Sequence, residues 1–297
     1  MSELRIKQLR YEFSYPGKIV LHPVVPTITL RGAFGYALAQ VIARNAHIPV
    51  IADQVELYRR IFMPINNVGA YSSRNLDLAR PFVLRGFYSR ADKRSFILEV
   101  NLFGEATDFE SFFDTVIETI AFMGVGPNKQ VCKLLKISSC MVNVETPAPK
   151  RFLEVDFLTP CSRLKSEGLI FKDEIPFYVL FARLADRVQE LYKLYESDRE
   201  FPGDNKFVAE LKHQAKNILW KKLSGGVCSA SRTSGRTGQT MYLDGFCGSM
   251  GYCGDFSCYT LYLKYLPYIN LGRFNVFGCG WCNMEYKDTI SDTRRIV

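Results

Sequence analysis

The sequence predicts an α+β fold made of two tandem ferredoxin-like (RRM-like) domains. The first half has the element order β-α-β-β-α-β, which is the order of a ferredoxin-like domain. The second half repeats the alternation of strands and helices, as expected for a diverged duplication of one module. A Pro-Ala-Pro-Lys stretch at 147–150 separates the halves. We therefore expect an N-terminal domain at residues 1–146 and a C-terminal domain at residues 151–297.

Hydrophobic periodicity identifies the elements of the first half. Thr29 is a suitable N-cap for the first helix, whose apolar positions Leu30, Phe34, Leu38 and Val41 follow a 3.6-residue period. The expected elements are a strand at 4–13, a helix at 30–45, strands at 81–87 and 95–103, a helix at 111–123 and a strand at 133–144.

The second half begins with a strand that directly follows the proline-rich stretch. Two helical patterns and a loop rich in Ser, Gly and Thr come next, and an apolar helical run precedes the end. The expected elements are a strand at 152–158, helices at 176–195 and 207–223, a loop at 224–240, a strand at 241–253, a helix at 259–271 and a strand at 281–286.

The composition is that of a basic globular protein. Hydrophobic residues make up 47% of the 297 residues, charged residues make up 23%, and the net charge is +8. This charge favours polyanionic partners, with nucleic acid ahead of membrane. The sequence has neither an apolar run of membrane-spanning length nor a signal-peptide pattern at its N-terminus, so we expect a cytoplasmic protein.

Nine cysteines, an odd number, fit reduced thiols better than a disulfide framework. Cys279 and Cys282 form a C-x-x-C pair with Cys247, Cys253 and Cys258 upstream, so zinc has to be considered. A clean second C-x-x-C pair is missing, and an odd spacing on a strand points two side chains to opposite faces. We interpret these cysteines as buried small residues, and we predict no metal and no other cofactor.

The segment from Leu271 to Trp281 interleaves three glycines with an arginine and two phenylalanines. Glycine lets a large anion approach backbone N–H groups closely, and an arginine adds charge that suits a phosphate. Gly272, Arg273, Gly278 and Gly280 are therefore candidate RNA-binding residues. The alternative is a tight connection whose glycines only permit positive φ.

A second basic feature lies between Phe201 and Thr240, where seven Lys and Arg residues stand against two acids. Lys212 and Lys216 are four residues apart and share one helix face. The loop that follows mixes hydroxyls, glycines and arginines, a set that suits backbone phosphates. The alternative is a solvated helix face with a mobile loop. The candidate RNA-binding residues of this segment are Lys212, Lys216, Lys221, Lys222, Arg232 and Arg236.

Only three histidines are present, at positions 22, 47 and 213. His47 lies at the end of the first predicted helix, where the helix dipole favours a protonated imidazole. His22 precedes Pro23 in an apolar stretch, and His213 lies on the basic helix. Position alone favours a structural role for His47 over a catalytic one.

Several motifs, in this order along the chain, resemble the Cas6 family, the CRISPR repeat-processing endoribonucleases of the RAMP superfamily. In this sequence they lie at Leu30–Gly35, Ala79–Leu84, Leu102–Gly104, Phe157–Leu164, and from Asp244–Gly248 through Gly278–Gly280. The resemblance departs at Asn270 and Arg273, where some relatives carry a histidine and a lysine, and at 124–129, where an arginine is missing.

The resemblance implies two ferredoxin-like domains and cleavage of the repeat in precursor CRISPR RNA without a metal. The 2′-hydroxyl attacks the adjacent phosphorus and leaves 2′,3′-cyclic phosphate and 5′-hydroxyl ends. His47 matches the family's catalytic histidine. Tyr36 would orient the reacting groups, with a core tyrosine as the alternative, and a cation such as Arg44 or Arg273 would stabilise developing charge. Expected partners are precursor and mature guide RNA and other subunits of a CRISPR effector complex. The alternative is a non-catalytic subunit that only holds a guide RNA.

Overall fold

The computed structural model describes residues 3–45, 79–89, 91–162, 164–166, 169–171, 173–196, 203–233 and 238–289. The chain divides into two compact units. The N-terminal unit contains residues 3–142 and residues 190–198, which include the last turns of a later helix that ends at Tyr195. The C-terminal unit contains residues 143–189 and 199–297, with residues 1–2. Both units combine helices with antiparallel sheets, as the sequence predicts for two ferredoxin-like domains.

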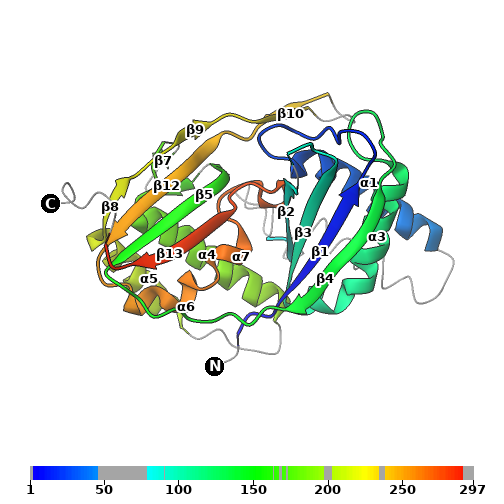
Figure 1. Ribbon diagram of the computed structural model, residues 1–297. Helices are drawn as coiled ribbons and strands as arrows, with labels where there is room; N and C mark the ends of the chain where they lie inside the picture. Colours follow the sequence, from blue (N-terminus) through cyan, green and yellow to red (C-terminus); the bar gives the residue numbers. More distant parts are fainter. Residues whose placement is uncertain are drawn as a thin grey trace. The chain divides into compact units, whose positions relative to one another are not determined.

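The N-terminal unit has one four-stranded antiparallel sheet in the order β2-β3-β1-β4, with two long helices on one face (Figure 1). This strand order confirms the predicted β-α-β-β-α-β arrangement. Rings of Phe34, Phe82 and Phe113 meet between the helices and the sheet, with centroids 5.3 to 5.8 Å apart. The elements are β1 (Ile6–Ser14), α1 (Thr27–Asn45), β2 (Phe82–Tyr88), β3 (Ser95–Phe103), α3 (Glu110–Met123) and β4 (Lys133–Met141).

Helix α1 begins at Thr27, so the prediction that Thr29 is its N-cap is wrong. The side chain of His22 organises the turn before the helix, because its Nδ1 accepts hydrogen bonds from the backbone N–H groups of Val24 and Val25. Thr29 lies inside the first turn, where its Oγ1 accepts from the N–H of His22 at 3.0 Å. The loop thus lets the helix start at Thr27, three residues before the predicted start at Leu30.

The C-terminal unit has a sheet in the order β13-β5-β12-β8, with β9 also paired to β12. Phe177 anchors its core, because its ring meets the rings of Tyr252, Phe256 and Tyr259 at 5.1 to 5.4 Å. The elements of the sheet and its helices are β5 (Phe152–Ser162), α4 (Phe177–Tyr195), α5 (Asn205–Gln214), β8 (Leu219–Lys222), β9 (Gly226–Cys228), β12 (Gly245–Cys253), α6 (Thr260–Leu263), α7 (Leu266–Ile269) and β13 (Cys282–Lys287).

Two small hairpins complete the C-terminal unit. Strands β6 (Leu164–Ser166) and β7 (Leu169–Phe171) form one, and β10 (Ser231–Thr233) and β11 (Thr240–Tyr242) form the other. The predicted loop at 224–240 therefore contains two short strands.

Two helix predictions in this unit are wrong at their C-terminal parts. The helix predicted at 207–223 ends at Gln214, and after a 3₁₀ turn Leu219 and Trp220 pair with Cys253 and Tyr252 of β12. The helix predicted at 259–271 is two short helices, α6 and α7. Pro267 lies at the start of α7, where its missing N–H is tolerated, and it cannot continue a longer helix.

Candidate nucleic-acid interface

The glycine-rich loop between α7 and β13, residues 271–281, has a backbone conformation that requires glycine at some positions. Asn270, Gly272, Phe274, Gly278 and Gly280 have φ angles between +51° and +87°. A Cβ atom at Gly280 would lie 1.7 Å from the carbonyl oxygen of Leu271, and one at Gly272 would lie 2.6 Å from that of Ser162. The backbones approach too closely at both positions for any other residue.

Strand β5 holds this loop through hydrogen bonds. Gly280 donates to the carbonyl of Pro160 at 3.0 Å, and Arg273 donates its backbone N–H to the carbonyl of Ser162 at 3.0 Å. The Thr159 hydroxyl donates to the carbonyl of Gly278 at 2.7 Å and accepts from the N–H of Trp281 at 2.9 Å. Backbone donors thus used inside the unit include those of residues 271, 273 and 277–281.

These internal bonds decide between the two interpretations of the glycines. The seven backbone N–H groups at 271, 273 and 277–281 are committed to the fold, so they are not available to a phosphate. Gly272, Gly278 and Gly280 set the shape of the loop, and the side chains that the loop presents are what an RNA would meet.

Gly280→Ala should lower the free energy of unfolding of the C-terminal unit by about 3 kcal/mol, because it adds a left-handed alanine and a backbone clash. Gly238→Ala is the matched control: its φ is +67°, and none of the described atoms lies within 4 Å of the added Cβ. It should cost only about 1 kcal/mol. Urea unfolding monitored by circular dichroism measures both. Equal midpoints for the two variants would show that the loop relaxes around the added methyl group.

Arg273 projects from this loop, and its side chain is exposed. Its guanidinium lies 5.3 Å from the centroid of the Phe274 ring. Arg232 of hairpin β10–β11 lies 5.1 Å from the centroid of the Phe277 ring, and the two phenylalanine rings are 6.1 Å apart. Partial burial lowers the pKa of Arg232. The structure thus joins two predicted RNA-binding arginines through a pair of phenylalanines.

The phenylalanine pair was missed by the sequence interpretation, which counted charges and glycines. A signal for it existed, because Phe274 and Phe277 are three residues apart in a loop that also carries an arginine. Nothing in the nearby sequence marks Arg232, which lies 41 residues before Arg273, as the cation that would reach Phe277.

The lysines predicted to bind RNA have surroundings that differ from those of the two arginines. Lys212 on α5 forms an ion pair with Asp186 of α4, and Asp186 also pairs with Arg183 at 3.2 Å. Lys222 pairs with Asp173 at 2.7 Å. Lys216 is exposed in the 3₁₀ turn after α5, and Lys221 is half-buried on β8. The prediction of one basic helix from 207 to 223 is therefore wrong for Lys221 and Lys222, which lie on a strand.

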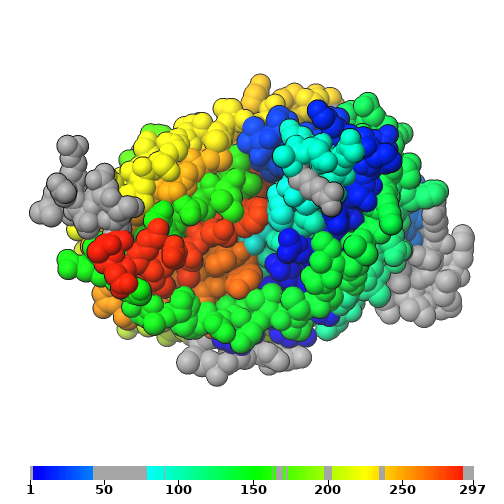
Figure 2. Space-filling model, viewed as in Figure 1, coloured from blue at the N-terminus to red at the C-terminus, as the bar shows by residue number. Residues whose placement is uncertain are grey.

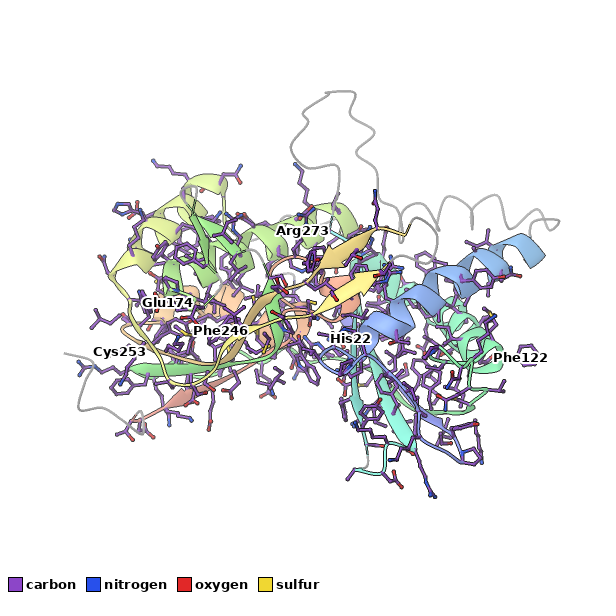
Figure 3. All side chains as sticks on the ribbon, turned by 90° about the horizontal axis from the view of Figure 1, so that it is seen from above. His22, Phe122, Glu174, Phe246, Cys253 and Arg273 are labelled. Atoms are coloured by element: carbon purple, nitrogen blue, oxygen red, sulfur yellow. The ribbon has the colours of Figure 1, made fainter. Side chains whose placement is uncertain are left out.

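The candidates in this unit fall into two groups along β12. Ser162, which bridges to Arg273, pairs with Gly245 at the start of β12. Lys221 and Lys222 lie opposite Gly251 and Met250, five or six residues further along the strand, or about 16 to 20 Å. In Figure 3, Arg273 lies beyond Phe246, at the end of β12 opposite to Cys253.

The sheet face turned away from the helices carries acids at its centre. Residues 152, 154 and 156 of β5 alternate with buried ones, which places Glu154 and Asp156 on this face, opposite Glu285 and Asn283 of β13. Lys287 pairs with both Glu154 and Glu285, and Ser249 donates to Asp156. Figure 2 views this surface, where β13, β5 and β12 lie side by side. Carboxylates here disfavour an RNA backbone, and the glycine loop stays the better candidate.

The predicted catalytic residues belong to the N-terminal unit. Tyr36 lies on α1 with 58% of its side chain exposed, which excludes the alternative of a core tyrosine. His47 and the side chain of Arg44 lie outside the described residues, as does Arg236 of the C-terminal unit. Their roles stay predictions.

The buried cysteines of the C-terminal unit are thiols in an apolar interior. Cys161, Cys279 and Cys282 are fully buried, and burial raises the pKa of Cys279 to about 12. Cys247 is only half-buried, but burial also raises its pKa. Zinc binds thiolates, and a raised pKa favours the protonated thiol. In the part of the chain that the structure describes, no three His, Cys, Asp or Glu side chains are grouped to hold a metal ion.

Comparison with known proteins identifies the family. The family model for CRISPR-associated endoribonuclease Cas6 matches residues 155–282, and a second model, described as an N-terminal domain, matches residues 4–150. No curated protein matches significantly. None of the described helices is long and apolar enough to span a membrane.

Several solved structures align with this chain. A Cas6 product complex aligns with a TM-score of 0.54 at 14% identity, over 95% of this chain and 100% of that chain. A Cas6-related protein from Pyrococcus furiosus aligns with a TM-score of 0.46 at 12% identity, over 94% and 98%. Thermus thermophilus Cse3, bound to an RNA representing a pre-cleavage complex, aligns at 0.31 and 12%, over 96% and 100%. By its match to the family model, the segment at residues 155–282 belongs to the CRISPR-associated endoribonuclease Cas6 family.

Proposed function

We propose that this chain binds the repeat of precursor CRISPR RNA and cleaves it without a metal ion. The observation that carries the proposal is the Cas6 match over residues 155–282, which contains the whole glycine-rich loop. The chain is basic, and the loop presents an exposed arginine beside a second one. RNA bound by an endoribonuclease has to be held by its phosphates before it is cut, and arginine suits that task.

The proposed reaction uses a nucleophile that the RNA supplies. The 2′-hydroxyl next to the scissile phosphate loses its proton and attacks phosphorus in line, and the 5′-oxygen of the next nucleotide leaves and takes up a proton. The products carry a 2′,3′-cyclic phosphate and a 5′-hydroxyl. Both the attacking and the leaving oxygen need proton transfer, which is the work of a general acid or base.

Residues of the N-terminal unit would carry this chemistry. We assign the proton transfer to His47. Tyr36, exposed on α1, would orient the reacting hydroxyl or phosphate. Arg44 would stabilise the charge that builds on the phosphate oxygens. Of the predicted lysines, Lys212, Lys216, Lys221 and Lys222 would add phosphate contacts, each in exchange for its present interaction, which for Lys212 and Lys222 is an ion pair with an aspartate. A surface ion pair contributes only about 0 to 1 kcal/mol to the free energy of unfolding, so its replacement by a phosphate contact costs little free energy.

Incubation of the purified protein with its own repeat RNA in EDTA tests the proposal. We expect two fragments, of which the upstream one ends in a 2′,3′-cyclic phosphate and the downstream one can be phosphorylated directly by polynucleotide kinase. Binding without cleavage would favour the guide-RNA-binding subunit instead, and neither binding nor cleavage would reject a role in repeat processing.

A further inference from the structure

Two arginines of the C-terminal unit lie over phenylalanine rings that contact each other. Arg232 lies over Phe277 and Arg273 over Phe274, and neither guanidinium has a carboxylate partner among the residues that the structure describes. Arg151 and Lys264 also lie over rings, those of Phe152 and Tyr265, and five other described cations of the unit are paired with acids. Those pairs are Lys150 with Asp288, Arg183 and Lys212 with Asp186, Lys222 with Asp173, and Lys287 with Glu154 and Glu285.

The phenylalanines bring the two arginines to one place. Arg232 comes from hairpin β10–β11 and Arg273 from the glycine-rich loop. The two segments meet where the Arg232 guanidinium lies over the Phe277 ring, which is in edge-to-face contact with the Phe274 ring of the same loop. The backbone under Arg273 is fixed by its bond to Ser162. Arg232 lies opposite Met241 in the hairpin, which fixes its backbone as well.

Phe274 adopts a conformation that a phenylalanine does not choose freely. Its φ is +66°, in the left-handed region, which costs a residue with a side chain about 1 to 2 kcal/mol. A glycine would remove the strain but also the ring. The strained residue places its ring against Phe277 and under the guanidinium of Arg273, so the strain is retained together with this arrangement.

A guanidinium over a ring keeps its hydrogen-bond donors. The contact uses the π face of the ring, and the N–H groups of the arginine stay directed elsewhere. Holding the side chain in place also removes part of the entropy that binding would otherwise cost. Two cations held in this way, without a carboxylate partner among the described residues, form a site for an anion with two neighbouring charges.

We propose that Phe274 and Phe277 are positioning residues that hold Arg273 and Arg232 together as a two-guanidinium site for adjacent phosphates of bound RNA. The proposal rests on the proposed function, because it names how that RNA is held. It assigns the rings to the arginines and not to the nucleobases.

A double-mutant cycle tests the assignment. Binding is measured over a range of salt concentrations with repeat RNA that carries a 2′-deoxy nucleotide at the cleavage site, and with a generic single-stranded RNA. Arg232→Ala should weaken binding about tenfold and reduce the salt slope by about 0.7, the value for one single-strand phosphate contact. Phe277→Leu should weaken binding about threefold to tenfold in the wild-type background and not at all in the Arg232→Ala background. Phe277→Tyr, which keeps the ring, should bind like the wild type.

Two controls separate positioning from loss of structure or charge. Phe207→Leu removes an exposed ring of α5, and Lys287→Ala removes an ion-paired cation of β13; both should bind with wild-type affinity and slope. The thermal unfolding midpoint of each variant has to stay near that of the wild type. If Phe277→Leu shifts the midpoint, the milder Phe277→Met replaces it.

Each outcome decides the matter. An equal loss of affinity from Phe277→Leu in both backgrounds would mean that the ring contacts the RNA itself, and an unchanged slope in Arg232→Ala would mean that no phosphate lies there; either result overturns the proposal. Cleavage of repeat RNA by the wild type is scored separately, so that a chain that cuts but ignores these substitutions rejects only this inference. The generic RNA keeps the site testable if the repeat is not recognised.

Discussion

His47→Ala should slow cleavage of repeat RNA by at least about a hundredfold while the affinity for the repeat stays within about twofold of the wild type. The physical reason is that proton transfer to or from the reacting oxygens occurs only in the transition state. Removing the group that performs it therefore changes the rate and not the binding. Single-turnover cleavage with enzyme in excess measures the rate, and binding to an RNA that cannot be cut measures the affinity.

The chain offers a matched control in His213, an exposed histidine of α5. His213→Ala should cleave at the wild-type rate. His22 is a poor control, because its Nδ1 accepts two backbone hydrogen bonds before α1 and its removal would disturb that helix. A His47→Ala protein that cuts at the wild-type rate would contradict the assignment and move attention to Tyr36, an exposed residue of α1.

The fold of the N-terminal unit could be predicted nearly completely from its sequence. Each expected element is present, and β3 has the predicted bounds Ser95–Phe103. Periodicity suffices there because each helix and strand buries one regular face. The early start of α1 escaped prediction, since it depends on a histidine side chain that replaces backbone partners in the preceding turn.

The C-terminal unit shows where local pattern is not enough. The segment Leu219–Lys222 comes soon after a helix and carries helix-forming lysines, yet it forms β8, because β12 supplies a strand edge for it to pair with. That pairing joins residues about thirty positions apart. Tertiary contacts of this kind override propensity, and a single sequence does not display them.

The candidate site divides in the same way. The glycine-rich loop could be found from composition, but its committed N–H groups could not, since their acceptors include carbonyls of β5 more than a hundred residues earlier. Charge counting identified Lys212 and Lys222 as free cations, whereas the fold gives each an aspartate, 26 and 49 residues away. Net charge predicts the class of partner, and only the fold shows which cations are available to it.

A single 2′-deoxy nucleotide placed just 5′ of the scissile phosphate should abolish cleavage while the RNA still binds. The substitution removes one oxygen, the proposed nucleophile, and leaves every phosphate and every other hydroxyl in place. Because most of the affinity comes from the backbone charges, the dissociation constant should change by less than about threefold. The 2′-hydroxyl is also the group by which a protein distinguishes RNA from DNA at such a site.

The control for this substrate is the same 2′-deoxy substitution moved one nucleotide downstream, where it should leave cleavage intact. Cleavage of both RNAs is measured in EDTA and in magnesium, so that the source of the nucleophile and the need for a metal are tested together. A nucleophile that comes from metal-bound water would cut the 2′-deoxy RNA and would need the ion. Cleavage of that RNA, or a strict requirement for magnesium, would contradict the proposed mechanism and leave the phosphate contacts of Arg232 and Arg273 as a binding function alone.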